Sequence, residues 1–351
     1  MSDSRQLAER VLTRVWEADA FAAAALDAEI ARHVAIDPRD AGLATELVYG
    51  VLRTQGALET QLQGLTTKGK LTLNSPSRAH LLMAAYSICF LDRIPAFAAV
   101  NEAVAGITST GDIRTASFVN AILRKLVATI ENEGRPSLSA AISASAPGWF
   151  RGALRRSLGR KDAEAYLAAG PVPPPIGLSL HTNEDLTAWL TTLQQAAPQA
   201  TFELGKASPR AILVRGAGDV RHLPGAGKAW IIQEEGAQVV ALALGARTGE
   251  RVLDACAGRG NKTWILGDNV GSSGSVDAAD LYPAKLERLR EASFGSFVRQ
   301  TFVVDWSVET HTGPMPPRDY DRVLVDAPCS GTGTLRRRPE IARHRSLEDV
   351  Q

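Results

Sequence analysis

A carboxylate and a thiol stand close together in the last part of the chain, at Asp326 and Cys329. They follow a mostly apolar run, 322–325, that predicts a buried strand, and they precede a glycine-rich turn. Ligands of open α/β sheets bind just beyond the carboxyl ends of the strands. A thiol beside an acid in that place has the chemistry needed to act at carbon 5 of a pyrimidine ring. Taken alone, the pattern is equally compatible with a strand, a turn and an incidental cysteine.

A second candidate loop follows another predicted strand, 251–254. Its glycines would let the backbone turn sharply and approach a ligand closely. The spacing matches neither the dinucleotide fingerprint nor a Walker A loop. We predict that this loop binds a cofactor, and its predicted contact residues are Cys256, Ala257, Gly258, Arg259, Gly260, Asn261 and Lys262.

Three acids close three consecutive predicted strands, at Asp254, Asp280 and Asp305. Asp280 could accept hydrogen bonds from both ribose hydroxyls of a nucleoside, and Asp305 could bind the amino group of an adenine. Together, these acids predict a site that binds a nucleoside but has no phosphate-binding loop. S-adenosylmethionine is a nucleoside derivative without a phosphate group, so it fits such a site. Its sulfonium also favours acidic surroundings. A helix N-cap would explain any one of these acids, but the ordered set less well.

The predicted elements divide the chain into four parts. Residues 1–132 read as an all-α domain, and 133–175 read as a linker with helices. A small α+β subdomain with strands at 176–180 and 211–214 and a helix at 183–197 occupies 176–229. From 230 to 351, strands and helices alternate, which predicts a parallel, doubly wound sheet. Its predicted strands are 251–254, 275–280, 298–305 and 322–326, and its predicted helices are 232–244 and 282–292.

In the N-terminal part, five helices are expected. Apolar spacing predicts them around Leu7 to Val15, over 41–53 and over 78–91, from Pro95 onward, and over 117–130.

Composition indicates an ordinary globular protein of two or three domains. The chain has 351 residues, 45% hydrophobic and 22% charged, with a net charge of +1. Its three cysteines are widely separated, which indicates a reducing compartment and no disulfide framework or zinc cluster. No signal peptide or membrane span is recognisable, so a cytoplasmic protein is expected. Cys89 reads as a core residue.

Two local basic segments interrupt this neutral composition. One runs from Arg151 to Lys161, and the other comprises Arg336, Arg337 and Arg338 with Arg343, His344 and Arg345 shortly after. Such segments fit a phosphate-bearing partner such as RNA, although a solvated helix face is the common alternative.

At this point the residues carry a family resemblance. Residues 326–333, Asp-Ala-Pro-Cys-Ser-Gly-Thr-Gly, are identical to the fourth motif of the bacterial ribosomal RNA cytosine-C5 methyltransferases of the Sun/Fmu group (the RsmB type), within the NOL1/NOP2/Sun family. Segments 233–238, 335–341 and 346–350 also resemble that family. Four N-terminal segments are similar to its NusB-type RNA-binding domain, namely 43–53, 90–95, 99–104 and 118–124.

The resemblance implies an S-adenosylmethionine-dependent enzyme that methylates a cytosine in small-subunit ribosomal RNA through a covalent cysteine adduct. It implies that Asp326 binds the N3 edge of the base and that Cys329 assists release, while a cysteine in a later motif attacks. No cysteine follows Cys329 in this sequence, so a C-terminally truncated chain is expected. Cys329 as the nucleophile is the rival assignment.

The cofactor loop departs from the family pattern, because Gly258, Arg259 and Asn261 replace an alanine, a proline and a glycine. The alternatives are a non-catalytic RNA-binding protein, a tRNA cytosine-C5 methyltransferase and a small-molecule methyltransferase. The expected protein is a monomer that binds RNA but no metal and no membrane.

Overall fold

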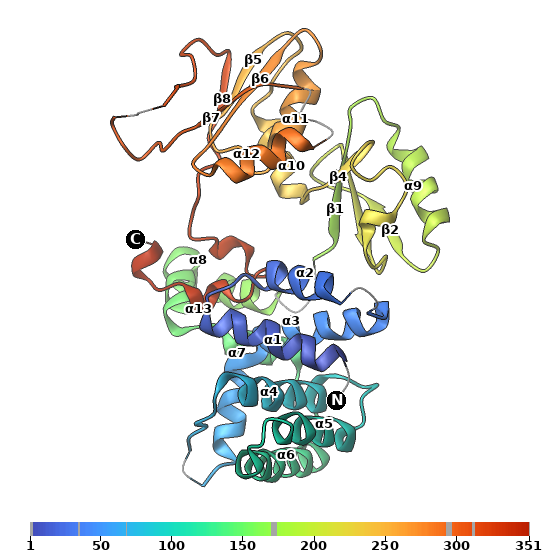
Figure 1. Ribbon diagram of the computed structural model, residues 1–351, viewed down its shortest axis with the longest axis vertical. Coiled ribbons are helices and arrows are strands. Elements are labelled where there is room, and N and C mark those ends of the chain that lie inside the picture. The colour runs from blue at the N-terminus through green and yellow to red at the C-terminus, as the bar shows by residue number, and fades with distance from the viewer. Residues whose placement is uncertain are drawn as a thin grey trace. The chain divides into compact units, whose positions relative to one another are not determined.

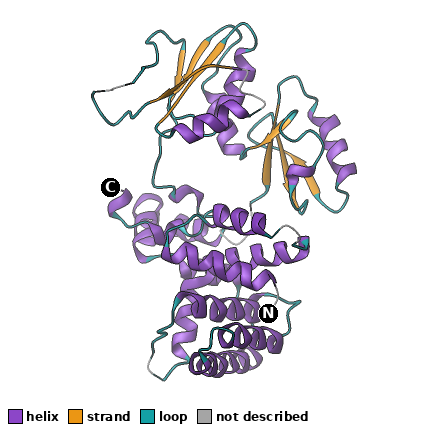
Figure 2. Cartoon of the chain, in the orientation of Figure 1, coloured by secondary structure: helices purple, strands orange, loops and turns teal. Residues whose placement is uncertain are grey.

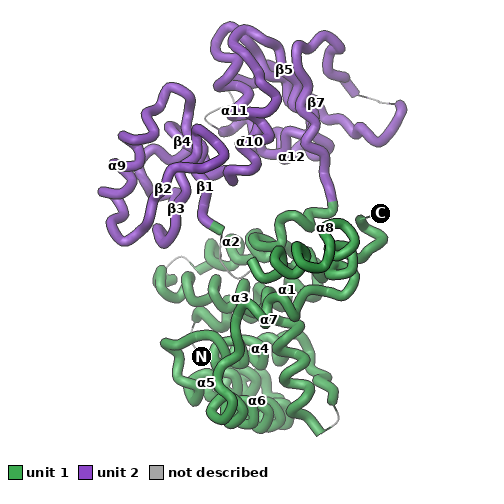
Figure 3. Tube along the Cα trace, turned by 180° about the vertical axis from the view of Figure 1, so that it is seen from behind, with its two compact units in different colours: residues 1–174, 330–351 green, residues 175–329 purple. Residues whose placement is uncertain are grey.

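The computed structural model describes residues 3–33, 36–67, 69–169, 174–292, 297–310 and 313–350. The chain forms two compact units (Figure 3). The first, here called the helical unit, comprises Met1–Pro174 together with Ser330–Gln351, and the second, the sheet unit, comprises Pro175–Cys329. The division into four parts expected from the sequence stays a prediction.

The helical unit consists of helices joined by loops (Figures 1 and 2). Eight of the helices that the structure describes precede the sheet unit in the chain, and a short ninth follows it. They are α1 (Asp3–Glu17), α2 (Ala22–Arg32), α3 (Pro38–Gly64), α4 (Ser75–Phe90), α5 (Ala96–Thr108), α6 (Ile113–Glu133), α7 (Leu138–Ser145), α8 (Gly148–Ala168) and α13 (Ile341–His344).

Local sequence sets where several of these helices begin. Asp37 precedes α3 and accepts a hydrogen bond from the amide of Arg39, while Pro38 occupies the first turn. Asn74 caps α4 in the same way through the amide of Ser77. Helix α4 is buried along nearly its whole length, so it forms the centre of one core with α1, α3, α5 and α6.

The sheet unit begins with a four-stranded antiparallel sheet in the order β2-β3-β1-β4. Helix α9 (Leu186–Ala196) packs on it. The side chain of Asp185 caps this helix by accepting from the amides of Thr187 and Ala188. The strands are β1 (Ile176–Leu180), β2 (Thr201–Leu204), β3 (Ala211–Arg215) and β4 (Trp230–Ile232).

The second sheet of this unit is parallel and has the order β7-β6-β5-β8. Buried side chains on its two faces alternate along the strands, with Val252 in one cluster and Leu253 in another. Its strands are β5 (Arg251–Asp254), β6 (Ser275–Asp280), β7 (Val298–Val303) and β8 (Arg322–Leu324), and its helices are α10 (Glu235–Ala243), α11 (Asn261–Val270) and α12 (Pro283–Glu291).

The strand order creates a switch point between β5 and β8. From β5 the chain moves outward through β6 to β7, and it then returns to the other side of β5 as β8. Ligands of open α/β sheets bind in the crevice at such a point, beyond the carboxyl ends of the strands. The two candidate loops of the sequence follow β5 and β8, so both lie at this place.

The predicted fold class is confirmed, with an all-α region followed by an α/β region with a parallel sheet. The predicted helix at 232–244 was wrong at its start, because Ile232 ends β4 and α10 begins at Glu235. Two strands of the antiparallel sheet, β2 and β4, were not predicted. The third and fourth parallel strands end two residues earlier than expected, at Val303 and Leu324. No helix within the described ranges is both long and apolar enough to cross a membrane.

Candidate active site

The loops after β5 and β8 meet through an ion pair between Lys262 and Asp326. Lys262 lies in the first turn of α11, and its ammonium group donates to the Asp326 carboxylate. The lysine side chain is 19% exposed, whereas that of Asp326 is 45% exposed. The ion pair therefore joins the predicted cofactor loop to the predicted catalytic loop, and it leaves the carboxylate accessible to a ligand.

The β5 loop turns through two glycines in the left-handed region. Gly258 has a φ of +58° and Gly260 a φ of +90°, and Gly260 is the N-cap residue of α11. A β-carbon at Gly258 would find no other atom within 4 Å. This backbone therefore faces open space in a conformation that side chains disfavour, as expected where a ligand approaches a main chain.

Asp280 holds two loops together at the end of β6. One carboxylate oxygen accepts from the amide of Gly258 at 2.9 Å, and the other accepts from the amide of Tyr282 at 2.9 Å. Lys285 lies 3.4 Å from the second oxygen. The carboxylate is mostly buried, with the residue 7% exposed. Each oxygen has a second lone pair, so the predicted contacts with ribose hydroxyls remain chemically open.

Asp254 is the most deeply buried acid of the set. It ends β5, is 1% exposed, and accepts a hydrogen bond from the hydroxyl of Thr263 at 2.8 Å. Burial raises the pKa of Asp254 to about 6, opposed by that hydrogen bond and by the positive charge of Lys262. Its place beneath the loop indicates that it holds the start of α11 against β5.

Asp305 lies in the turn after β7 and is half-buried. Its carboxylate accepts from the amide and the hydroxyl of Ser307, at 2.9 and 2.6 Å. The next residue, Trp306, was missed by the sequence analysis. Its indole N–H donates to the carbonyl of Ala255 at 2.6 Å, which fixes the ring beside the β5 loop. The sequence signal that could have identified Trp306 is its position directly after an acid at the end of a predicted strand.

The three cysteines occupy three different environments. Cys329 is exposed, Cys256 is partly exposed, and Cys89 is buried in the helical unit. Burial raises the pKa of Cys256, and the carboxylates of Asp254, Asp280 and Asp326 raise it further. Since thiolates are the reactive form, the surroundings of Cys256 oppose a nucleophilic role.

Arg259 and Asn261 are exposed on the β5 loop. The side-chain amide of Asn261 donates to the carbonyl of Ile232 at 3.1 Å, which connects the loop to β4 of the antiparallel sheet. Ala257 is buried, and its amide donates to the carbonyl of Ala279 at 2.8 Å. Of the predicted cofactor residues, some could contact a ligand through the main chain, some are buried by packing, and others have exposed side chains.

A buried polar cluster connects α11 to the antiparallel sheet, and sequence reasoning missed it. Asp268 of α11 pairs with the guanidinium of Arg210, which is 4% exposed, and lies 3.1 Å from Nδ1 of His181. The His181 ring stacks on Trp264 with a centroid distance of 3.8 Å. Burial would raise the pKa of Asp268, but the hydrogen bond from His181 and the charge of Arg210 lower it overall. The cluster fixes α11, and with it the cofactor loop.

Comparison with known proteins gives two family matches along the chain. Residues 2–128 match the NusB family. Residues 241–351 match the family described as 16S rRNA methyltransferase RsmB/F. The second match includes the loops after β5 and β8, so it covers both parts of the candidate site.

Similar whole proteins are also known. Ribosomal RNA small subunit methyltransferase B of Pseudomonas putida is 30% identical, over 99% of this chain and 78% of its own length. The probable ribosomal RNA small subunit methyltransferase B of Bacillus subtilis is 32% identical, over 90% of this chain and 71% of its own. The crystal structure of PH0851 shares the fold, with a TM-score of 0.75 at 19% identity, over all of this chain and 80% of that one.

Proposed function

Because the chain belongs to the RsmB/F family of 16S rRNA methyltransferases, we propose that it methylates carbon 5 of a cytosine in small-subunit ribosomal RNA, with S-adenosylmethionine as the methyl donor. The observation that carries the proposal is the meeting of two loops at the β5/β8 switch point, where Lys262 pairs with Asp326. A ribosomal substrate implies that the protein works in the cytoplasm.

The residues at the end of the sheet fit the proposed donor. Gly258 leaves open space along the loop, and Asp280 keeps lone pairs available for hydroxyl donors. The acids around the loop favour a cation, which suits a sulfonium. When bound there, S-adenosylmethionine supplies an electrophilic methyl group. Lys262, Asp280 and Asp305 are proposed to position it together with the backbone of residues 256–261.

The acceptor carbon must first be made nucleophilic. A thiolate adds to carbon 6 of cytosine, and the electron pair of the 5,6 double bond moves so that carbon 5 can take the methyl group. A base then removes the proton from carbon 5, and the thiolate leaves as the double bond re-forms. Asp326 is proposed to bind the N3 edge of the ring and stabilise the adduct, while Lys262 keeps that carboxylate oriented.

Cys329 is assigned to the release step, because the family resemblance places the attacking cysteine in a later motif. Its exposure next to the Asp326 loop suits a residue that must meet a large substrate. The target base must leave its stack to enter the site, which costs a few kcal/mol and less in single-stranded or loop RNA.

Nucleoside mass spectrometry tests the reaction. The protein expressed from its complete reading frame is incubated with labelled S-adenosylmethionine and unmodified small-subunit ribosomal RNA. The expected product is 5-methylcytidine. Methylation at another cytosine atom, or of tRNA alone, would overturn the assignment. RNA binding without donor uptake would favour a non-catalytic RNA-binding protein.

An adduct experiment separates the two assignments of Cys329. The variant Cys329→Ala, expressed from the complete reading frame, is incubated with RNA and donor and then run on a denaturing gel. Accumulation of a protein–RNA adduct is expected, since the attack proceeds but release is slowed. Complete loss of adduct would instead identify Cys329 as the nucleophile. Cys256→Ala is the matched control, and it should neither accumulate nor lose adduct.

A further inference from the structure

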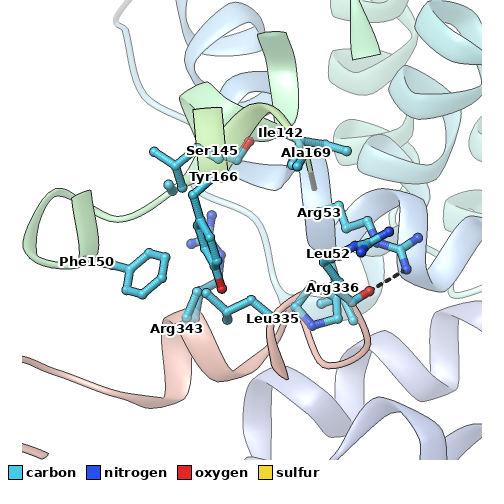
Figure 4. A pocket seen from close by; sticks show the side chains of 14 residues that line it. Leu52, Arg53, Ile142, Ser145, Phe150, Tyr166, Ala169, Leu335, Arg336 and Arg343 are labelled. Carbon is cyan, nitrogen blue, oxygen red and sulfur yellow. Dashed lines mark hydrogen bonds between the residues drawn. The ribbon is translucent and has the colours of Figure 1, made fainter. Parts of the chain in front are cut away.

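One pocket of the helical unit is lined by residues of α8 and of the segment 335–343, which lie far apart in the sequence. The pocket has a volume of about 260 Å³ and is shown in Figure 4. Its walls come from α3, α7 and α8, and from the segment 335–343. Helix α8 carries the first basic segment, and 335–343 carries most of the second. None of the methyl-transfer residues described above belongs to it.

The C-terminal wall of the pocket is held by specific hydrogen bonds within the helical unit. The carboxylate of Glu340 accepts from the amide of Ala22 at 3.1 Å, and the residue is 1% exposed. The guanidinium of Arg53 donates to the carbonyl of Arg336 at 3.0 Å. Glu340 and Arg53 therefore fix the main chain of this wall.

The pocket has an aromatic wall on α8. Phe150 is 5% exposed, whereas Tyr166 is 40% exposed, and their ring centroids lie 6.5 Å apart at an angle of 63°. In Figure 4 the Tyr166 ring stands between Phe150 and the segment that carries Leu335 and Arg343. A half-exposed ring above a buried one offers an apolar surface on which a flat base can stack.

Arginine side chains also line the pocket. Arg53, Arg336 and Arg343 all face the pocket. Burial lowers the pKa of Arg53, and the nearby charge of Arg336 lowers it further, although Glu46 opposes both. On α8, Arg156 and Lys161 are exposed and form no ion pair with any other residue that the structure describes. The surroundings therefore carry excess positive charge beside an aromatic surface.

We infer that this pocket binds one unstacked nucleotide of single-stranded RNA, with the base against Tyr166 and its phosphates against Arg336 and Arg343. Stacking needs no sequence readout, because every base has an aromatic face, and guanidinium groups match phosphate oxygens. The inference rests on the proposed function for the identity of the partner as RNA. It assigns the helical unit a binding site of its own, separate from the site of methyl transfer.

Fluorescence anisotropy with a short labelled single-stranded RNA tests the inference, in the absence of S-adenosylmethionine. Tyr166→Ala is expected to weaken binding by about 5- to 150-fold, the range that corresponds to the loss of one base–aromatic stack. Tyr166→Phe keeps the ring and should bind like the unmodified protein. Phe97→Ala is the matched control, since Phe97 is a 70% exposed aromatic residue of α5 outside the pocket.

Salt dependence separates stacking from phosphate contact. Arg336→Ala should reduce the slope of log affinity against log salt by about 0.7, whereas Tyr166→Ala should leave the slope unchanged. The exposed Arg114 of α6 provides the charge control, since Arg114→Ala removes a cation outside the pocket and should leave the slope unchanged. Photocrosslinking of RNA that contains 4-thiouridine should label Tyr166 or a residue next to it in the pocket.

The outcomes are distinct from those of the methyl-transfer experiment. Equal RNA affinity of Tyr166→Ala and the unmodified protein, with no crosslink at the pocket, would overturn the inference even if methylation is observed. Absence of methyl transfer together with Tyr166-dependent RNA binding would overturn the proposed function alone. Capture of a protein or a small apolar ligand by the pocket, with no RNA competition, would also overturn the inference.

Discussion

Ionisable groups have different surroundings in the core of the helical unit and at the carboxyl end of the parallel sheet. In the helical core, burial lowers the pKa of His80 to about 4 and raises that of Cys89 to about 12, so both are neutral near pH 7. At the sheet end, Lys262 and Asp326 form an ion pair, and Asp280 is surrounded by donors. Desolvation causes both pKa shifts in the first region, whereas charged and hydrogen-bonding partners surround Asp280 and Asp326 in the second. Asp254 and Cys256, also in the second region, have pKa values raised by burial.

The difference shows what each region is built to do. The helical core gains stability mainly from apolar packing, and its buried carboxylate, Glu29, lies against Arg14 and Arg32. A sheet end that gathers charged groups gives up some stability to keep them oriented before a ligand arrives.

The largest contrast should appear in thiol reactivity. With a pKa of about 12, Cys89 holds about a thousandfold less thiolate at pH 8 than an ordinary thiol, and burial restricts access further. Cys329 is exposed, so iodoacetamide should modify it first. Mass spectrometry of the alkylated protein over time measures both rates. Comparable rates at the two cysteines would show that the helical core opens readily.

The second contrast concerns the carboxylate of the ion pair. Asp326→Asn keeps the shape but removes the charge that pairs with Lys262 and that is proposed to stabilise the adduct. The kcat of methyl transfer should fall by about 10²- to 10³-fold, as for other groups that stabilise charge in a transition state. Asp319→Asn is the control, because the Asp319 side chain is 81% exposed. A fall in kcat of less than tenfold would show that Asp326 does not take part in methyl transfer.

The third contrast is in pH dependence. The pKa of Asp254 is about 6 in the folded protein against an ordinary 3.8, so folding binds a proton more tightly there. Stability is therefore lost as pH rises from about 4 through 6, by a total of about 3 kcal/mol. The variant Asp254→Asn lacks this loss, so its stability relative to the unmodified protein should rise with pH.

Denaturant unfolding of both proteins at pH 5 and pH 7.5 measures that change. About half of the effect is already present at pH 5, so the difference between the proteins should shift by about 1.5 kcal/mol. A difference that does not depend on pH would contradict the raised pKa. His80 acts in the opposite sense, because its lowered pKa removes stability as pH falls below 6.5 toward 4.

The smallest contrast compares two glycines. A β-carbon at Gly106 would lie 2.5 Å from the His80 ring, so Gly106→Ala should destabilise the helical unit by about 1–3 kcal/mol. Gly258→Ala meets no atom but must hold a φ of +58°, which costs about 1 kcal/mol. Thermal unfolding measures both. A larger loss at Gly258 would mean that the loop is packed rather than open.

Sequence reasoning located the parallel sheet because its strands are apolar runs that end in acids. It missed β2, where Phe202 is the only buried residue, and β4, whose last residue, Ile232, was taken into the predicted helix 232–244. Periodicity carries little signal in strands this short or this exposed. The same reasoning extended two strands past their true ends, where acids follow the last ladder pairs.

The residues of the candidate site were proposed from the sequence and stay a prediction, whereas the contacts between them come from the structure. That Asp326 meets Lys262 depends on β8 lying beside β5, which is a matter of strand order. Likewise, both basic segments were visible in the sequence, but the pocket that joins Phe150 and Tyr166 of α8 to Arg336 and Arg343 depends on how α8 and 335–343 pack. Contacts between distant segments follow from tertiary packing, which local patterns do not encode.

The cluster of Asp268, Arg210 and His181 has a practical consequence for expression of the sheet unit alone. A clone that begins at residue 230 or 241 would lack both Arg210 and His181, which precede it in the chain. It would leave the Asp268 carboxylate without Arg210 and His181, and it would expose the Trp264 indole on which His181 stacks. The shortest recombinant piece that keeps the cofactor loop in shape should therefore start at Pro175, ahead of β1.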